Sequence, residues 1–115
     1  MGCRKALLLA LFISALGSGC TQTPGGDAID AEFLYLANCA NCHGPRGTGG
    51  TGIAPAHQAN AFIESGSRGE IKQVIRKGRS FGEKRYKEFA STMPSWEGKL
   101  SEEEMDALVG YLKGL

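Results

Sequence analysis

Apolar residues recur at helical spacing in three segments of this chain, and no segment shows the alternation that is typical of a half-buried strand. The first predicted helix spans about residues 28–38, with Asp27 as its N-cap. Its apolar positions are expected to form a buried stripe made by Ile29, Phe33 and Leu36. The pattern therefore predicts an all-α domain that begins with a short amphipathic helix.

Two capping boxes mark the starts of the other two predicted helices. Ser67 with Glu70 opens one helix, which Gly78 closes, and Ser101 with Glu104 opens the C-terminal helix. The apolar faces are expected to consist of Ile71, Val74 and Ile75 in the first helix and of Met105, Leu108, Val109 and Leu112 in the second. All three helices are expected to lie in one domain, residues 27–115.

The N-terminal segment has the layout of a secretory signal peptide. Arg4 and Lys5 precede an uncharged apolar run over residues 6–16, and small residues follow. This run is shorter than the roughly 20 residues that a transmembrane helix needs. We expect residues 1–19 to be removed and the mature protein to be exported.

Cys20 stands where cleavage is expected. Residues 16–20, LGSGC, resemble a bacterial lipoprotein signal, although the leucine is one place further from the cysteine than is usual. The resemblance implies that Cys20 becomes the first mature residue and carries a diacylglyceryl group. Ordinary cleavage, with Cys20 left as a lone thiol, is the alternative. Residues 20–26 are polar and rich in glycine and proline, and they are expected to be a flexible tether.

The charge balance excludes one class of partner. The complete chain has 13 basic and 12 acidic residues, so its overall charge does not suggest nucleic-acid binding. Bases concentrate in residues 68–88, and acids concentrate in residues 102–106. This asymmetry favours electrostatic steering toward an acidic partner, while a merely solvated helix and loop remains an equal alternative.

The segment Cys39-Ala40-Asn41-Cys42-His43 fits the C-x-x-C-H attachment site of a c-type haem. Cys39 and Cys42 can each form a thioether with one haem vinyl group, and His43 can ligate the iron. Three other interpretations remain open: a thioredoxin-like redox pair, half of a zinc site, which needs two further ligands and for which only His57 is left, and a structural disulfide. The motif favours one covalent haem.

A six-coordinate haem needs a ligand opposite His43. Met93 precedes Pro94, which disfavours a helical conformation at Met93 and predicts a loop residue. Met105 lies on the apolar face of the last helix and is expected to be a core residue. His57 is the rival ligand, but only a short loop separates it from His43, and a surface or propionate-contacting role is the expected alternative.

Residues 27–115 resemble a small class I cytochrome c. The elements of that family occur in order: an aromatic-bearing helix, C-x-x-C-H-G at residues 39–44, Ala54-Pro55, Met93-Pro94 and a final helix. The resemblance implies a cytochrome c fold with helices packed around one haem. It also implies that Met93 is the second iron ligand.

The resemblance assigns further residues to the haem site. The carbonyl of Pro55 is expected to accept the N–H of the His43 imidazole, and Trp96 is expected either to contact a propionate or to be a simple core residue. His57 departs from the family, because an apolar residue that packs on the haem is common at that place. This departure bears on how dry that wall of the pocket is.

These features predict a membrane-tethered electron carrier with His/Met iron ligation, not an enzyme. Its partners would be redox proteins of an electron-transport chain, in the periplasm or at the outer face of the cytoplasmic membrane. Two alternatives are a haem-based enzyme or gas sensor with an open iron site, and a haem-free thiol–disulfide protein that uses Cys39 and Cys42.

Overall fold

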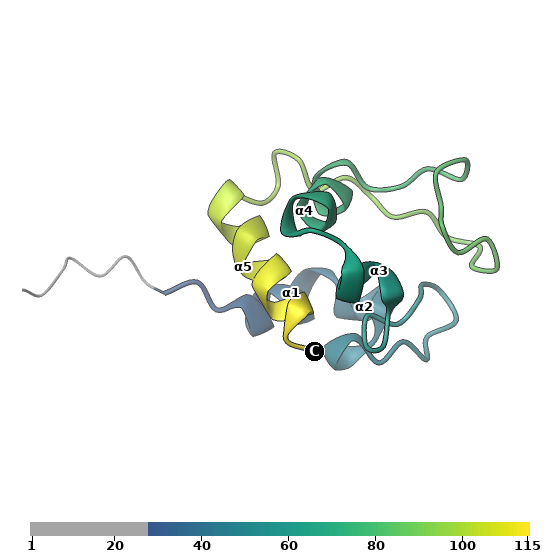
Figure 1. Ribbon diagram of the computed structural model, residues 1–115, viewed down its shortest axis with the longest axis horizontal. Helices are drawn as coiled ribbons and strands as arrows, with labels where there is room; N and C mark the ends of the chain where they lie inside the picture. The colour runs from purple at the N-terminus through teal and green to yellow at the C-terminus, as the bar shows by residue number, and fades with distance from the viewer. Residues whose placement is uncertain (1–27) are drawn as a thin grey trace, which may run out of the picture.

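Residues 28–115, which the computed structural model of the protein describes, contain five α-helices and one 3₁₀ turn (Figure 1). In chain order these are α1 (Ala31–Asn38), α2 (Ala40–His43), η1 (Pro45–Gly47), α3 (Ala61–Ser65), α4 (Arg68–Lys77) and α5 (Glu102–Lys113). Helix α5 packs against both α1 and α4. The all-α prediction is confirmed, since these residues contain only isolated β-bridges and no strand.

The first helix differs from the prediction in its start and in its buried face. Asp30 is the N-cap, and its carboxylate accepts the N–H of Phe33 at 2.9 Å. The predicted apolar stripe is wrong, because Ile29, Phe33 and Leu36 are 43%, 66% and 48% exposed. Tyr35 is fully buried instead. The amphipathic pattern misled because the side that α1 turns to the core carries a tyrosine with a polar hydroxyl.

The two capping boxes are confirmed. In α4, Ser67 and Glu70 exchange side-chain and backbone hydrogen bonds, and Ser101 and Glu104 do the same at the start of α5. Gly78 follows the last turn of α4, as predicted. The predicted faces lie inward and contribute most of the core, which consists of Tyr35, Ile63, Ile71, Ile75, Met105, Leu108, Val109 and Leu112.

Two short helices were not predicted. Helix α2 is a single turn that continues almost directly from α1, with Cys39 between them. Helix α3 has five residues, and the side chain of its N-cap, Asn60, accepts the N–H groups of Phe62 and Ile63. Segments this short hold no full period of apolar residues, so periodicity cannot reveal them.

Ion pairs join α4 to α5. Lys72 lies 2.8 Å from a carboxylate oxygen of Glu102 and 2.8 Å from one of Asp106, and Arg76 also pairs with Glu102. The basic and acidic segments of the sequence therefore face each other across a helix interface. Much of the expected charge asymmetry is neutralised within the domain.

The segments expected to attach the protein to a membrane lie outside the described residues. These are the leader 1–19, Cys20 and the tether 20–26. Among residues 28–115, none of the helices combines the length and the hydrophobicity needed to span a bilayer.

We expect Leu108→Ala to lower the free energy of unfolding by about 2–5 kcal/mol, because it leaves a cavity in the core. Leu36→Ala removes the same atoms from the exposed side of α1 and should change that free energy by less than about 0.5 kcal/mol. Unfolding in urea measures both variants. Equal losses would contradict the burial pattern described above.

Candidate functional site

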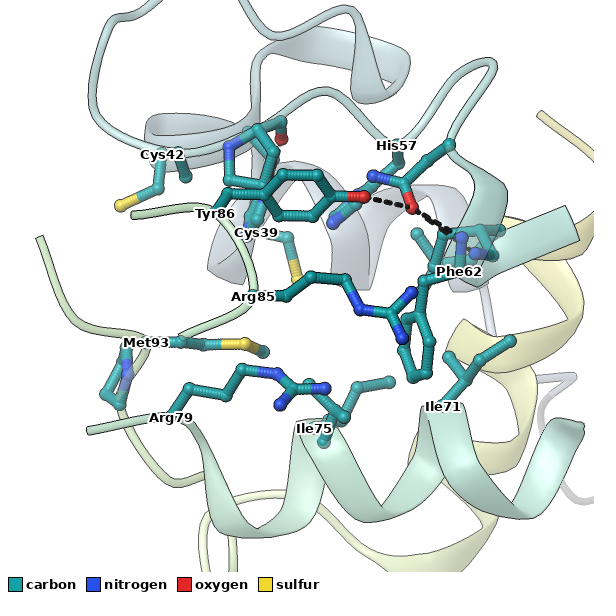
Figure 2. A pocket seen from close by; sticks show the side chains of 18 of the residues that line it. Cys39, Cys42, His57, Phe62, Ile71, Ile75, Arg79, Arg85, Tyr86 and Met93 are labelled. Atoms are coloured by element: carbon teal, nitrogen blue, oxygen red, sulfur yellow. Dashed lines mark hydrogen bonds between the residues drawn. The ribbon is translucent and has the colours of Figure 1, made fainter. Parts of the chain in front are cut away.

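A pocket opens between α2, α3, α4 and the connection of residues 79–100 (Figure 2). Its walls come from segments that are far apart in the sequence. The aliphatic and aromatic side chains that line it include Ile53, Phe62, Ile63, Ile71, Val74, Ile75, Phe89, Trp96, Leu108 and Leu112. Such a lining favours a bulky apolar group with few polar atoms.

Cys39 and Cys42 both line this pocket as free thiols. Residues three apart on a helical turn lie on the same face, and the turn of α2 is closed by the N–H of His43, which donates to the carbonyl of Cys39 at 2.9 Å. Both sulfur atoms and the imidazole therefore border the same pocket. This arrangement allows one ligand to be bound at three points.

The environment of Cys39 argues against two of the alternatives. Burial, followed by the proximity of Cys42, raises the pKa of the Cys39 thiol to about 11. Reactive cysteines of thiol–disulfide exchange have lowered pKa values instead. A structural zinc site needs four ligands, and no three His, Cys, Asp or Glu side chains form a metal-binding cluster within residues 28–115.

The imidazole of His43 is buried and oriented by one hydrogen bond. Its Nδ1 atom lies 2.8 Å from the carbonyl oxygen of Pro55, the contact that the family resemblance implied. Because a carbonyl only accepts, Nδ1 carries the proton and Nε2 keeps a free lone pair. Burial lowers the pKa of His43, and the bond to Pro55 opposes that effect. The ring is therefore a neutral donor to a metal ion.

His57 stacks on His43. The ring centroids are 3.9 Å apart and the planes differ by 25°. The Nδ1 atom of His57 lies 3.2 Å from the hydroxyl of Tyr35. Burial, and then the electrostatic interaction with the neighbouring His43, lowers the pKa of His57 to about 3. His57 is half-buried, and a ring stacked on His43 is not opposite it. The propionate contact expected as one role of His57 stays a prediction.

Met93 enters the pocket from another direction. Figure 2 shows its side chain reaching into the pocket from the connection that follows α4, a segment separate from the one that carries the two cysteines. The N–H of Arg79 donates to the carbonyl of Met93 at 2.9 Å, and the N–H of Met93 donates to the carbonyl of Arg79 at 3.1 Å. This pair of bonds fixes Met93 beside the end of α4.

Gly78 allows that close approach. Its φ angle is +69°, and a Cβ atom there would lie 2.4 Å from the carbonyl oxygen of Met93. No other residue type has both the conformational freedom and the space. The glycine that ends α4 is thus also the residue that admits the Met93 segment.

Two arginines of the connection reach the pocket, which the sequence did not indicate. The guanidinium carbons of Arg79 and Arg85 lie 5.5 and 5.0 Å from the centre of the Phe62 ring (Figure 2). Within residues 28–115 neither forms a salt bridge. Nearby, the hydroxyl of Tyr86 donates to the side chain of Asn60 at 3.1 Å. Two guanidinium groups that form no salt bridge among the described residues therefore lie beside an apolar pocket.

Trp96 belongs both to the pocket lining and to the edge of the core. Its backbone N–H donates to the carbonyl of Ile75 at 3.3 Å, and the ammonium of Lys99 lies 5.5 Å from the centre of its ring. The two roles expected for Trp96 are thus compatible in this fold.

The helices, the Cys-x-x-Cys-His turn and the distant methionine together define a class I c-type cytochrome domain. A comparison with protein families agrees: the family described as cytochrome C oxidase, cbb3-type, subunit III matches residues 26–112. The chain belongs to this family. Haem c is the cofactor of such domains, and electron transfer is their function.

Curated relatives carry names from the same oxidase. The chain is 28% identical over 112 residues to the cbb3-type cytochrome c oxidase subunit FixP of Bradyrhizobium diazoefficiens, covering 96% of this chain and 35% of the relative. It is 29% identical over 115 residues to subunit CcoP of Cereibacter sphaeroides, covering 95% and 36%. With CcoP of Rubrivivax gelatinosus the identity is 34% over 76 residues, covering 66% and 24%. The chain spans about a third or less of the length of these relatives.

We expect Gly78→Ala to destabilise the protein by about 1–3 kcal/mol, because alanine is strained at positive φ and its Cβ would displace Met93. Gly69→Ala is the matched control, since it lies on the same helix with open space around it. That variant should be neutral or more stable by up to about 1 kcal/mol. Thermal unfolding of both variants gives the comparison. Equal stability would contradict the close approach of the two segments.

Proposed function

We propose that this domain carries single electrons on one haem c, bound covalently through Cys39 and Cys42. The observation that carries the proposal is the convergence of Cys39, Cys42, His43 and Met93 on one apolar pocket. The count of one haem rests on the single Cys-x-x-Cys-His segment of the sequence.

We assign the two axial positions to His43 and Met93. The free Nε2 lone pair of His43 supports its role, and the hydrogen bond to Pro55 orients the ring and makes it a more basic ligand. The thioether of Met93 reaches the pocket from the end of α4. His57 is not a competitor, because its ring stacks on that of His43.

The bound haem supplies an iron atom that alternates between the ferric and the ferrous state. The thioether of Met93 favours the ferrous state and raises the reduction potential relative to two histidines. With His43 and Met93 in place no coordination position is left for a substrate. We therefore propose a carrier, not an enzyme in its own right.

The charged and aromatic residues of the pocket support one orientation of the haem. Its two propionates need cations, and Arg79 and Arg85 lie at the pocket without carboxylate partners in the described part of the chain. Trp96 and Phe62 offer aromatic surface for the ring system. We propose that the propionates lie on the side of the two arginines.

The rival functions have weaker support. A gas sensor or haem enzyme requires an open iron site, but Met93 lies in the pocket where it can close that site. A haem-free thiol–disulfide protein requires a reactive thiol, but the pKa of Cys39 is raised. Electron transfer by a bound haem accounts for Met93 in the pocket and for the unreactive thiol of Cys39, and it requires no additional catalytic residue.

Membrane attachment is part of the proposal and rests on the sequence. We propose that residues 1–19 direct export, that Cys20 carries a lipid, and that residues 20–26 tether the domain at the periplasmic side of a membrane. The named relatives are oxidase subunits, which supports redox proteins of a respiratory chain as partners. The basic residues in the first part of the connection, residues 79–88, are available to an acidic partner.

Replacement of the second ligand tests the function directly. We expect Met93→Ala to keep the haem attached but to lower the reduction potential by on the order of 100 mV, within the range of about 0.8 V that axial ligands set. The ferric protein should become high-spin and bind carbon monoxide readily when reduced. Met105→Leu, a conservative change of a buried core methionine, should leave potential and spectrum unchanged. An unchanged potential in Met93→Ala would remove Met93 from the site.

The lipid anchor has a separate test. Cys20→Ser should move the protein from the membrane fraction to the soluble fraction, because a hydroxyl cannot form the thioether to the lipid. Cys3→Ser, in the part of the leader expected to be removed, should leave the distribution as in the wild type. Cell fractionation followed by immunoblotting measures both. Continued membrane retention of Cys20→Ser would contradict the anchor.

A further inference from the structure

His57 is a half-buried titratable residue for which electron transfer, as proposed above, requires no role. Its imidazole stacks on that of His43 at 3.9 Å between centroids. An apolar side chain would fill the same space with less cost of burial, since an imidazole has two polar nitrogen atoms. The contacts around His57 indicate what an imidazole at this position does that an apolar side chain could not do.

Three contacts hold the His57 side chain and backbone in place. The N–H of His57 donates to the carbonyl of Gly47 at 2.8 Å, its Nδ1 atom meets the Tyr35 hydroxyl at 3.2 Å, and the Tyr35 ring stands at 69° to the imidazole. Gly47 has a φ angle of +71°, and a Cβ there would lie 2.8 Å from the Cβ of His57. The imidazole therefore has little rotational freedom.

The hydrogen bonds fix the tautomer of His57 and connect it back to His43. The hydroxyl of Tyr35, which is fully buried, donates to the carbonyl of Gly44 at 3.1 Å. Its oxygen then accepts the Nδ1–H of His57. Gly44 directly follows His43, so the chain of contacts that begins at His43 ends at its neighbour in the sequence.

The imidazole of His43 is consequently held on two sides by one short segment. The carbonyl of Pro55 binds its edge at 2.8 Å, and the ring of His57 covers its face. A single hydrogen bond allows the ring to tilt about the N–H···O direction. A second ring, itself locked by Tyr35, removes that freedom.

We propose that His57 is a positioning residue for His43, whose stacked ring sets the rotation of the His43 imidazole about its bond to the haem iron. This inference rests on the proposed ligation by His43 and Met93. The plane of an axial imidazole determines how unpaired spin of ferric iron is shared among the four pyrroles. Contacts around a ligating histidine tune a metal site through such orientation.

The experiment is the proton NMR spectrum of the ferric holoprotein, in which the four haem methyl shifts report the plane of the axial ligands. We expect His57→Leu to change the spread or the order of these shifts. Tyr35→Phe, which removes only the hydroxyl, should cause a smaller change in the same direction. Leu36→Ala, on the exposed side of α1 and outside the pocket, should leave the shifts as in the wild type.

Unchanged haem methyl shifts in His57→Leu overturn the inference. If His57→Leu does not retain haem, Tyr35→Phe is measured in its place. Unchanged haem methyl shifts in Tyr35→Phe then overturn the inference. The Met93 methyl resonance of the reduced protein shows in every variant whether the opposite ligand has stayed. A wild-type protein without a low-spin His/Met spectrum overturns the proposed ligation, and the inference with it. A low-spin His/Met spectrum of the wild type together with unchanged haem methyl shifts in His57→Leu overturns the inference but leaves the proposed ligation intact.

Discussion

The hydrogen bond from His43 to the carbonyl of Pro55 connects the attachment turn to the segment that folds around it. The bond length is 2.8 Å, and its donor can only be Nδ1, which leaves Nε2 with a free lone pair. The same segment carries His57, which stacks on a face of the ring. One short loop thereby contacts both the edge and a face of the His43 imidazole, and its hydrogen bond fixes the tautomer.

Met93, the proposed second ligand, is positioned by a different constraint. Met93 is held by backbone bonds to Arg79 at the end of α4, and Gly78 supplies the space for that contact. The two proposed ligands thus belong to separate parts of the chain, and α5 joins these parts by packing on both α1 and α4. The contacts that hold His43 and those that hold Met93 share no residue.

Basic residues serve two purposes within one short region of sequence. On α4, Lys72 and Arg76 pair with acids of α5 and stabilise the helix interface. In the connection that follows, Arg79 and Arg85 lie at Phe62 and form no salt bridge within the described residues. The amino-acid composition does not distinguish these four basic residues. Their roles differ because α4 has a defined partner helix, whereas the connection borders the pocket.

The sequence by itself determined the class of the protein, the cofactor motif and two of the helices. Capping boxes and the four-residue spacing of Cys39 to His43 act locally, so the residues involved are neighbours in the chain and can be read there. The buried face of α1, the stacking of His57 and the entry of Arg85 were decided only by the tertiary structure. Each depends on which distant segment packs against it, and periodicity contains no information about that partner.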